Sequence, residues 1–240
     1  MSVRLPVVVF LGFLLSTCAS RETLPRFTGK EYVPLAVGAY WEYSLTTTTI
    51  NPVEGQVNTL TEIKLEVMDR LEQNGVTIYV IRRYTRPVGS PTYSSDETWS
   101  VQEDKFRYIQ QEGNVPFLRL QFPLTDGKTW NGNAFNTLGG SDDCGDGNFT
   151  CDIYRVADLG KPFELPGTVT YGDTVSITEQ EDDDAIVGKD MRKSVYARGI
   201  GLVYRERTHL EYCTVGSCIG QQVVENGIIE RQILLTYGAQ

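Results

Sequence analysis

Histidine, the residue most often used in acid–base and metal chemistry, occurs once in this chain of 240 residues, as His209. A Ser-His-Asp or Cys-His catalytic arrangement would therefore have to use His209 or dispense with imidazole. His209 lies in the segment ERTHLEY, whose alternation predicts a β-strand with His209 on its surface or in a cross-strand pair. Metal sites built from several histidines are excluded. The sequence also lacks the GxSxG, P-loop, HExxH and dinucleotide-binding motifs.

Carboxylates are the other side chains here that could do chemistry, and there are 31 of them. Two carboxylates suffice for glycoside hydrolysis, one acting as an acid and the other as a base or nucleophile. With so many to choose from, spacing alone singles out no pair. We therefore expect that the protein is not an enzyme, and keep a carboxylate-based hydrolase as a less favoured alternative.

One glycine-rich segment, SDDCGDGNFTCD (residues 141–152), gathers enough oxygen-bearing side chains to be a candidate calcium site. Calcium is bound by several carboxylate, amide and carbonyl oxygens, and such turns present them close together. The spacing does not match an EF-hand, and an ordinary solvent-exposed loop is the favoured interpretation. The sequence suggests no cofactor other than calcium. The candidate ligands are Asp142, Asp143, Asp146, Asn148 and Asp152.

A second acidic cluster, EQEDDD (residues 179–184), lies between two segments with strand character. Closely spaced like charges repel one another, so this cluster is expected at the tip of a mobile hairpin. Calcium capture by these acids is the less favoured interpretation.

The N-terminal residues have the layout of a bacterial lipoprotein signal. Arg4 precedes an apolar run, LPVVVFLGFLL, which is shorter than the roughly 20 residues of a membrane span. The run ends in LSTC, which resembles a lipobox, where the cysteine (here Cys18) is lipidated and becomes the new N-terminus. Ordinary signal cleavage near Ala19 is the alternative. We expect a signal peptide at residues 1–17, the lipidated cysteine and a tether at 18–31, and a single β domain at 32–240.

These features predict a protein of the bacterial cell envelope, attached to a membrane through its N-terminal lipid. Ala19, directly after the cysteine, is compatible with delivery to the outer membrane, by resemblance to known sorting patterns. The chain carries a formal net charge of −9, so it should repel nucleic acid and anionic headgroups. Attachment should therefore depend on the acyl chains.

Four cysteines beyond Cys18 are expected to form two disulfides in an oxidising compartment. Three pairings are open. Short loops close most easily, which favours Cys144–Cys151 and Cys213–Cys218. The spacings are not those of a CxxC motif, so redox or zinc chemistry is not expected.

The elements that position these residues are expected to be β-strands throughout. Residues 40–46 and 62–67 alternate between apolar and polar side chains, which is typical of strands with one face in a core. Asn74-Gly75 is a favoured two-residue turn and predicts a hairpin. Short strands recur and no long helical pattern does, so the chain should be all-β, as a single-domain antiparallel barrel, half-barrel or sandwich. Other strand candidates are ETWSVQ, KFRYIQQ, FLRLQF, GTVTY, TVSITEQ, KSVYARG, GLVYRERTHLEY and RQILLTYG.

The frame Pro-Leu-x-x-Gly-x-x-Trp occurs twice, as PLAVGAYW at residues 34–41 and as PLTDGKTW at residues 123–130. In each copy Pro fixes φ, Gly permits a turn with positive φ, and Trp begins a strand as a large core anchor. Two copies suggest two similarly organised β segments in one sheet system. Trp41, Trp99 and Trp130 are assigned to the core, and a sugar-binding aromatic platform is the alternative.

Three motifs in order resemble an uncharacterised family of Bacteroidetes-like surface lipoproteins: YVPLAVGAYWEY early, FPLTDGKTW in mid-chain and YARGIGLVYRE near the end. The resemblance covers residues 32–206. It implies a secreted β domain on a lipid anchor and brings no catalytic residue with it.

The sequence thus favours a lipid-anchored envelope protein with a binding or structural role toward an envelope protein or glycan. A small-ligand or lipid carrier in an open barrel is the main alternative, followed by the hydrolase. A large apolar cavity would favour the carrier. A cleft with two close carboxylates, one of them with a strongly raised pKa, would favour the enzyme.

Overall fold

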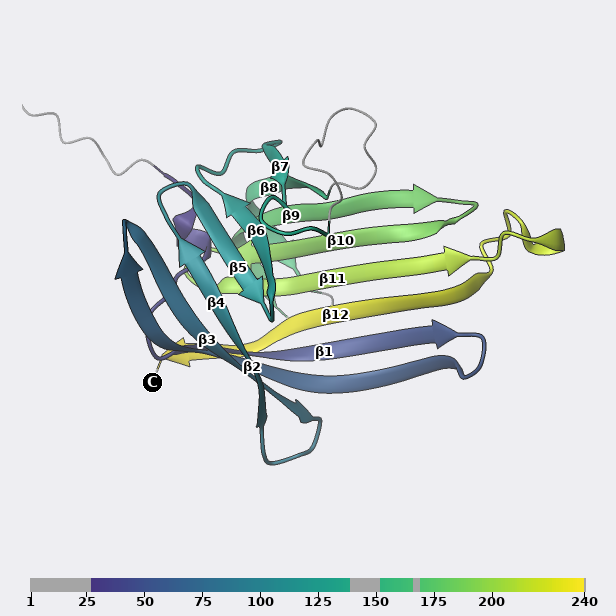
Figure 1. Ribbon diagram of the computed structural model, residues 1–240, viewed down its shortest axis with the longest axis horizontal. Coiled ribbons are helices and arrows are strands. Elements are labelled where there is room, and N and C mark those ends of the chain that lie inside the picture. The colour runs from purple at the N-terminus through teal and green to yellow at the C-terminus, as the bar shows by residue number, and fades with distance from the viewer. Residues whose placement is uncertain (1–26, 139–151, 166–168, 240) are drawn as a thin grey trace, which may run out of the picture.

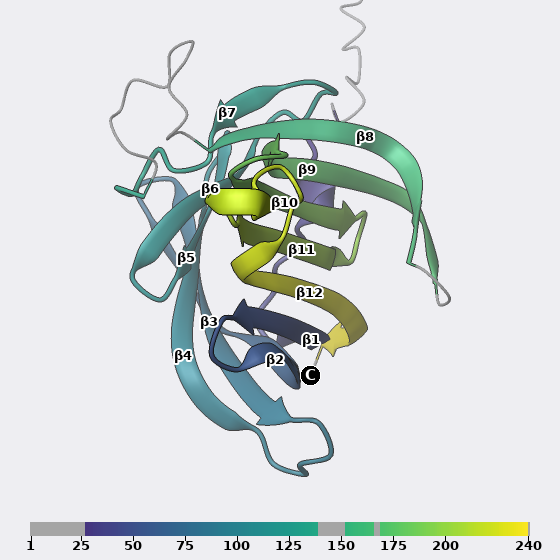
Figure 2. The same cartoon turned by 90° about the vertical axis from the view of Figure 1, so that its right-hand side faces the viewer.

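The fold is a nearly closed β-barrel formed by one antiparallel sheet (Figure 1, Figure 2). The computed structural model describes residues 27–138, 152–165 and 169–239. Within these ranges the chain forms a single all-β domain with two short 3₁₀ segments, η1 (Lys30–Tyr32) and η2 (Gly216–Cys218). None of the helical segments described has the length or the hydrophobicity needed to cross a membrane. The strands are β1 (Ala39–Asn51), β2 (Gly55–Gln73), β3 (Val76–Pro87), β4 (Ser94–Glu103), β5 (Arg107–Glu112), β6 (Val115–Gln121), β7 (Thr129–Asn131), β8 (Ile153–Glu164), β9 (Thr170–Asp184), β10 (Gly188–Ala197), β11 (Gly201–Tyr212) and β12 (Val224–Ala239).

The described strands follow one another around the barrel as a meander. Their order is β6-β5-β4-β3-β2-β1-β12-β11-β10-β9-β8-β7, so pairing of β1 with β12 joins the first strand to the last. The edge strands β6 and β7 meet through a few hydrogen bonds. The Leu118 N–H donates to the Gly132 carbonyl (2.9 Å), and the Trp130 Nε1–H donates to the Leu118 carbonyl (2.8 Å). We call this meeting point the seam. Of the three architectures expected, the chain adopts the barrel.

Most strands follow the alternation in the sequence, with three exceptions, β7, β8 and β9. β2 and β3 join through Asn74 and Gly75, both with positive φ (53° and 79°), as the sequence predicts. The last two residues of the candidate GTVTY, Thr170 and Tyr171, lie in one strand with TVSITEQ, β9, because Gly172 between them lies inside the strand and makes no turn. β8 is not predicted, because Asp158 and Gly160, with φ of 54° and 75°, interrupt its alternation. The short β7 is not predicted either.

The two copies of the PLxxGxxW frame adopt the same turn. In the first, the Ala39 N–H donates to the Ala36 carbonyl (3.0 Å), and Gly38 has φ of 84°. This places Gly38 third in the turn, where positive φ is required of a type II geometry. In the second copy, Lys128 donates to Thr125 (3.1 Å) and the intervening Gly127 has φ of 75°. The expected need for glycine is confirmed at both positions.

The frame marks the start of each half of the barrel. Trp41 lies in β1 and Trp130 in β7, and both side chains are buried (8% and 6% exposed). Each frame glycine donates its N–H to the second strand of its half, Gly38 to Val67 of β2 and Gly127 to Val156 of β8, at 2.9 Å in both cases. The barrel therefore consists of two six-stranded meanders, β1–β6 and β7–β12, which begin in the same way.

The segment around η1 closes one end of the barrel. Figure 2, which looks along the barrel from the opposite end, shows η1 at the far end. Tyr32 and Val33 are buried, and the Tyr32 hydroxyl donates to Asp173 (2.5 Å). The Glu31 carbonyl accepts a hydrogen bond from the Gly199 N–H (2.7 Å). The last residues assigned to the tether from the sequence thus contact the barrel.

Candidate functional site

The barrel interior is apolar at the η1 end. The side chains of Trp41, Tyr43, Leu65, Ile81 and Tyr196 pack there, directly inside Val33 and Leu35 of the N-terminal segment. The space left between them is only about 50 Å³. Burial raises the pKa of the Tyr43 hydroxyl well above its usual range, and that hydroxyl donates to the Leu202 carbonyl. This end of the interior is a core and leaves no room for a ligand.

Farther along the barrel the interior opens into a cavity of about 600 Å³, which we call the charged chamber. Its volume is within the range of small-molecule sites. Its lining has many ionisable groups, in contrast to the mostly apolar lining of such sites. The lining residues are Leu45, Ile63, Arg83, Glu97, Trp99, Glu112, Phe117, Arg119, Leu138, Asp152, Tyr154, Glu179, Arg192, Arg205, Glu206, Arg207, Glu230 and Gln232.

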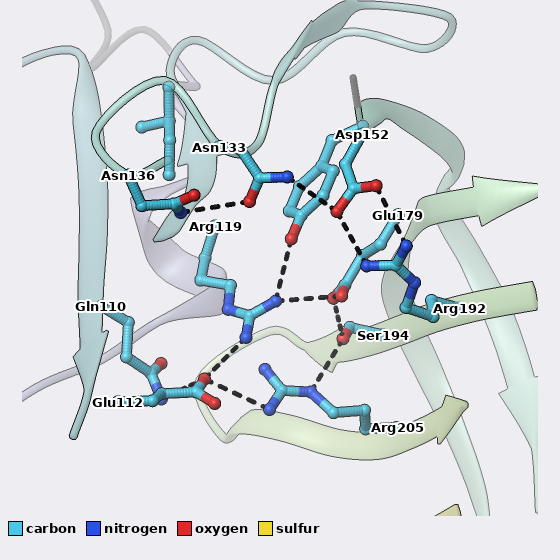
Figure 3. A network of polar contacts seen from close by, with 12 residues as sticks. Gln110, Glu112, Arg119, Asn133, Asn136, Asp152, Glu179, Arg192, Ser194 and Arg205 are labelled. Carbon is cyan, nitrogen blue, oxygen red and sulfur yellow. Dashed lines mark hydrogen bonds and ion pairs between the residues drawn. The ribbon is translucent and has the colours of Figure 1, made fainter. Parts of the chain in front are cut away.

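Arg119 of β6 is the centre of a polar network at the floor of the chamber (Figure 3). Its Nη2 donates to Glu112 of β5 (2.7 Å), and its Nη1 donates to Glu179 of β9 (2.9 Å) and to the Tyr154 hydroxyl of β8 (3.1 Å). The Arg119 side chain is only 6% exposed. A guanidinium so deeply buried is stable only when paired, and two carboxylates share that task here.

A second arginine closes the network into a ring. Arg205 of β11 donates from Nε to the Ser194 hydroxyl (3.2 Å) and lies 3.3 Å from Glu112. Ser194 of β10 in turn donates to Glu179 (2.5 Å). Six strands thereby contribute to the floor, and its two arginines balance its two glutamates. The network ties together strands from both halves of the barrel.

The pKa values at the floor reflect this pairing. Burial alone would raise the pKa of Glu112, but Arg119 and Arg205 outweigh it and lower that pKa to about 2. Burial opposes the charge on Arg119 too, yet its acidic and tyrosine neighbours hold its pKa well above the usual range. Glu112 is therefore a fixed anion at neutral pH. Arg119 Nε has no hydrogen-bond partner among the described residues, so one buried donor still faces no acceptor.

A second set of charges forms one wall of the chamber (Figure 3). Arg192 of β10 donates to both carboxylate oxygens of Asp152 (2.7 and 3.0 Å) and to Asp190 (3.0 Å). Asn133 also donates to Asp152 (2.9 Å). Asp152 is a candidate calcium ligand in the sequence, and in the structure an arginine and an amide occupy its oxygens. The remaining candidates, Asp142, Asp143, Asp146 and Asn148, lie outside the described residues, as do Cys18, Cys144 and Cys151.

The mouth of the chamber carries two further pairs of opposite charges, on two walls. Arg207 of β11 faces Glu230 of β12 across the ladder, with 3.7 Å between Nη1 and the carboxylate. On β3 and β4, Arg83 and Glu97 are likewise opposite each other, and the Arg83 guanidinium lies 5.6 Å from the ring centre of Trp99. Trp99 donates to Glu97 (2.6 Å).

Two expectations about single residues need correction. Trp99 is not a core residue like Trp41 and Trp130, because it is only partly buried and lines the chamber. Glu179 is not at a mobile hairpin tip, because β9 continues through residue 184 and Glu179 is buried (5% exposed) against Arg119. The acids after it do lie toward the tip of the β9–β10 hairpin.

The other residues selected from the sequence lie apart from the floor network. His209 is 44% exposed, and its Nδ1 lies 3.8 Å from Asp190. Cys213 and Cys218 form a disulfide in the β11–β12 connection, with their Cα atoms 5.9 Å apart. Within the described residues, no group of three or more His, Cys, Asp or Glu side chains is arranged to hold a metal ion.

The chain is distantly similar in structure to two bacterial proteins. One is a "putative exported protein" with a YmcC-like fold from Bacteroides fragilis, 13% identical, with a TM-score of 0.41 over 85% of this chain and 97% of that protein. The other is a "putative lipoprotein" from Parabacteroides distasonis, 8% identical, with a TM-score of 0.39 over 86% of this chain and 98% of that protein. No family model and no curated protein matches the sequence.

Proposed function

We propose that the protein is a lipid-anchored binding protein of the bacterial envelope, and that it takes a small polar ligand into the charged chamber. The observation that carries this proposal is the chamber itself, about 600 Å³ of space lined by paired charges and open beside a well-packed core. Barrels of this size enclose cavities because side chains alone do not fill them. In a barrel with only a structural role, well-packed apolar side chains would stabilise about as well as buried ion pairs and would leave no open space.

The composition of the lining disfavours the lipid carrier that the sequence left open. An acyl chain in the chamber would lie against Arg119, Glu112 and Glu179 and would keep water from the polar groups above them. Removing water from charged groups without replacing its hydrogen bonds costs several kcal/mol, on the order of what burying an alkyl chain contributes. A ligand with its own polar groups avoids this cost.

The chemistry of the floor also favours binding over hydrolysis. A general acid at neutral pH needs a carboxyl group whose pKa is raised toward 7. Glu112 has the opposite property, because its two arginine neighbours lower its pKa. Glu179 is bonded at once by Arg119 and Ser194. Both carboxylates thus serve as partners of fixed cations.

Ligand-induced stabilisation of the purified chain in detergent tests the binding role. Thermal melts are recorded with amino acids, short peptides and mono- and disaccharides, and at least one class should raise Tm. A ligand at a hundred times its Kd stabilises by about 2.7 kcal/mol. Leu45→Trp should abolish the shift by filling the chamber, whereas Thr46→Trp, at the next and exposed position of β1, should keep it. A shift that survives Leu45→Trp, or no shift with any compound, would contradict the proposal.

The anchor has a separate test at Cys18, the expected site of lipidation. Cys18→Ser should abolish metabolic labelling with a fatty acid and release the protein from the membrane fraction, because no other acyl attachment is expected. Cys213→Ser is the matched control, since it changes a cysteine of the barrel and should leave labelling intact. Full membrane retention of the Cys18→Ser protein would refute the anchor.

A further inference from the structure

The mouth of the charged chamber presents charges of both signs in two separate places. Arg207 and Glu230 are cross-strand neighbours on β11 and β12, and Arg83 and Glu97 are cross-strand neighbours on β3 and β4. All four line the same cavity. A ligand that enters the chamber therefore meets an arginine and a glutamate on each of two walls.

The Arg207–Glu230 pair at the mouth is held less firmly than the pairs at the floor. Arg207 and Glu230 are 3.7 Å apart, with side chains 49% and 31% exposed. Arg119 and Glu179 are 2.9 Å apart, with side chains 6% and 7% exposed. Exposed ion pairs contribute little to stability, whereas breaking a buried pair is strongly destabilising. The Arg207–Glu230 pair can exchange its partners for those of a ligand, and the buried pairs at the floor cannot.

The overall balance of charge decides which ligands suit the lining. The chamber is lined by five arginines and six acidic residues, so neither sign dominates. A ligand with only negative groups would be attracted by the arginines and repelled by the acids, and a purely positive ligand would be attracted by the acids and repelled by the arginines. A molecule with one group of each sign can be placed so that both interactions are favourable.

Apolar side chains in the chamber lining add a third requirement. Leu45 of β1, Trp99 of β4 and Phe117 of β6 line the same space as the charged groups. Apolar and aromatic side chains bury apolar ligand surface and stack on planar groups. The ligand should accordingly have an apolar body between, or next to, its charged ends.

We infer that the ligand of the charged chamber is a compact zwitterion with an apolar body, of the class of short peptides with free termini. This inference rests on the proposed function. The peptide carboxylate pairs with Arg207 or Arg83, the ammonium group pairs with Glu230 or Glu97, and a side chain lies against Trp99. The floor network stays intact. It disfavours a wholly apolar ligand, because such a ligand would remove water from these charged groups without replacing its hydrogen bonds.

Isothermal titration calorimetry with the full chain in detergent tests this class. The probes are tripeptides with a central leucine, phenylalanine or tryptophan flanked by alanines, each with free termini, with an acetylated N-terminus or with an amidated C-terminus. Blocking either terminus should weaken binding about tenfold, which corresponds to about 1.4 kcal/mol. Equal affinity of free and blocked peptides, or no peptide binding while a sugar or a singly charged compound binds, would overturn the zwitterion class and leave the binding role standing. No binding by any compound would overturn both.

A variant of the mouth shows where the carboxylate lies. The double variant Arg207→Gln, Arg83→Gln should bind the free peptide about tenfold more weakly. Its affinity for the C-amidated peptide should not change, because that peptide has no carboxylate for these arginines to pair with. Arg70→Gln, at a half-exposed position of β2 outside the chamber, is the control and should change neither. If the double variant weakened both peptides equally, the assignment of the carboxylate to these arginines would be wrong.

Discussion

The two ends of the barrel interior are built from the same strands and have opposite chemistry. Along β10, Tyr196 belongs to the apolar end, Ser194 to the floor of the charged chamber and Arg192 to its wall. Along β1, the order from the same end is Trp41, Tyr43 and then Leu45. The change from core to chamber thus happens within two residues along both of these strands.

The apolar end of the interior stabilises the fold, whereas the charged chamber is the part suited to binding a ligand. At the η1 end, nearly all of the space between side chains is filled, so each large residue contributes its full burial. At the other end the space is left open and its charges are paired, firmly at the floor and more loosely between Arg207 and Glu230 at the mouth. Changes at the apolar end should therefore affect folding, changes at the floor should affect both properties, and changes at the mouth should affect binding alone.

The largest effect is expected from removing the tryptophans of the two frames. Trp41→Ala and Trp130→Ala should each lower the free energy of unfolding by about 3–5 kcal/mol, because each leaves a large cavity and an unpaired carbonyl at Ile200 or Leu118. Trp99→Ala should cost much less, because Trp99 is only partly buried. Urea unfolding measures all three. If Trp41→Ala and Trp99→Ala lowered the free energy of unfolding equally, Trp99 would be as much a core residue as Trp41, which would contradict the distinction between core and chamber.

Acid should weaken the floor of the chamber. The pKa of Glu112 is about 2 in the folded state, below its usual 4.5, so its stabilising contribution is complete above about pH 4.5 and is lost as pH falls toward 2. The loss attributable to this group is about 3 kcal/mol. Glu112→Gln should be less stable at neutral pH and should show a flatter decline between pH 5 and 2. A decline as steep as that of the unaltered protein would show that Glu112 is not responsible.

Much of the apolar end follows from the sequence, whereas the floor of the chamber does not. The two PLxxGxxW frames predict that Trp41 and Trp130 are buried and that their glycines form turns, because a turn followed by a tryptophan at the start of a strand is a local feature. Arg119 stands between Leu118 and Leu120 in FLRLQF, and a polar residue among apolar ones is what a surface face would also show. Arg119 belongs to the floor only because Glu112 of β5 and Glu179 of β9 lie beside it. Which strands pair, and in which register, cannot be read from the sequence near Arg119.

A smaller effect is expected from the glycines that allow the frame turn. Gly127→Val should cost about 2 kcal/mol, because Gly127 has φ of 75° and a β-branched residue resists that conformation. Gly38→Val should behave likewise, since its φ is 84°. Gly172→Val is the matched control: a Cβ at Gly172, as at Gly127, meets no atom within 4 Å, but φ at Gly172 is not in the positive range. Thermal melts measure the effect. If Gly127→Val and Gly172→Val lowered Tm equally, the positive φ of Gly127 would not be the cause of the destabilisation.

The smallest effect on stability, and the sharpest test of the comparison, is expected at the mouth. Arg207→Gln should change the free energy of unfolding by less than about 0.5 kcal/mol, because its pair with Glu230 is half-exposed and its closest contact is 3.7 Å. Arg119→Gln should instead destabilise by about 3 kcal/mol or more, because it leaves Glu112 and Glu179 short of their buried partner. Both changes remove one arginine from the same chamber, so the total charge of the lining changes equally. Urea unfolding at pH 7 compares them directly. If Arg207→Gln lost as much stability as Arg119→Gln, the mouth would be part of the fold and not a surface free to exchange its partners with a ligand.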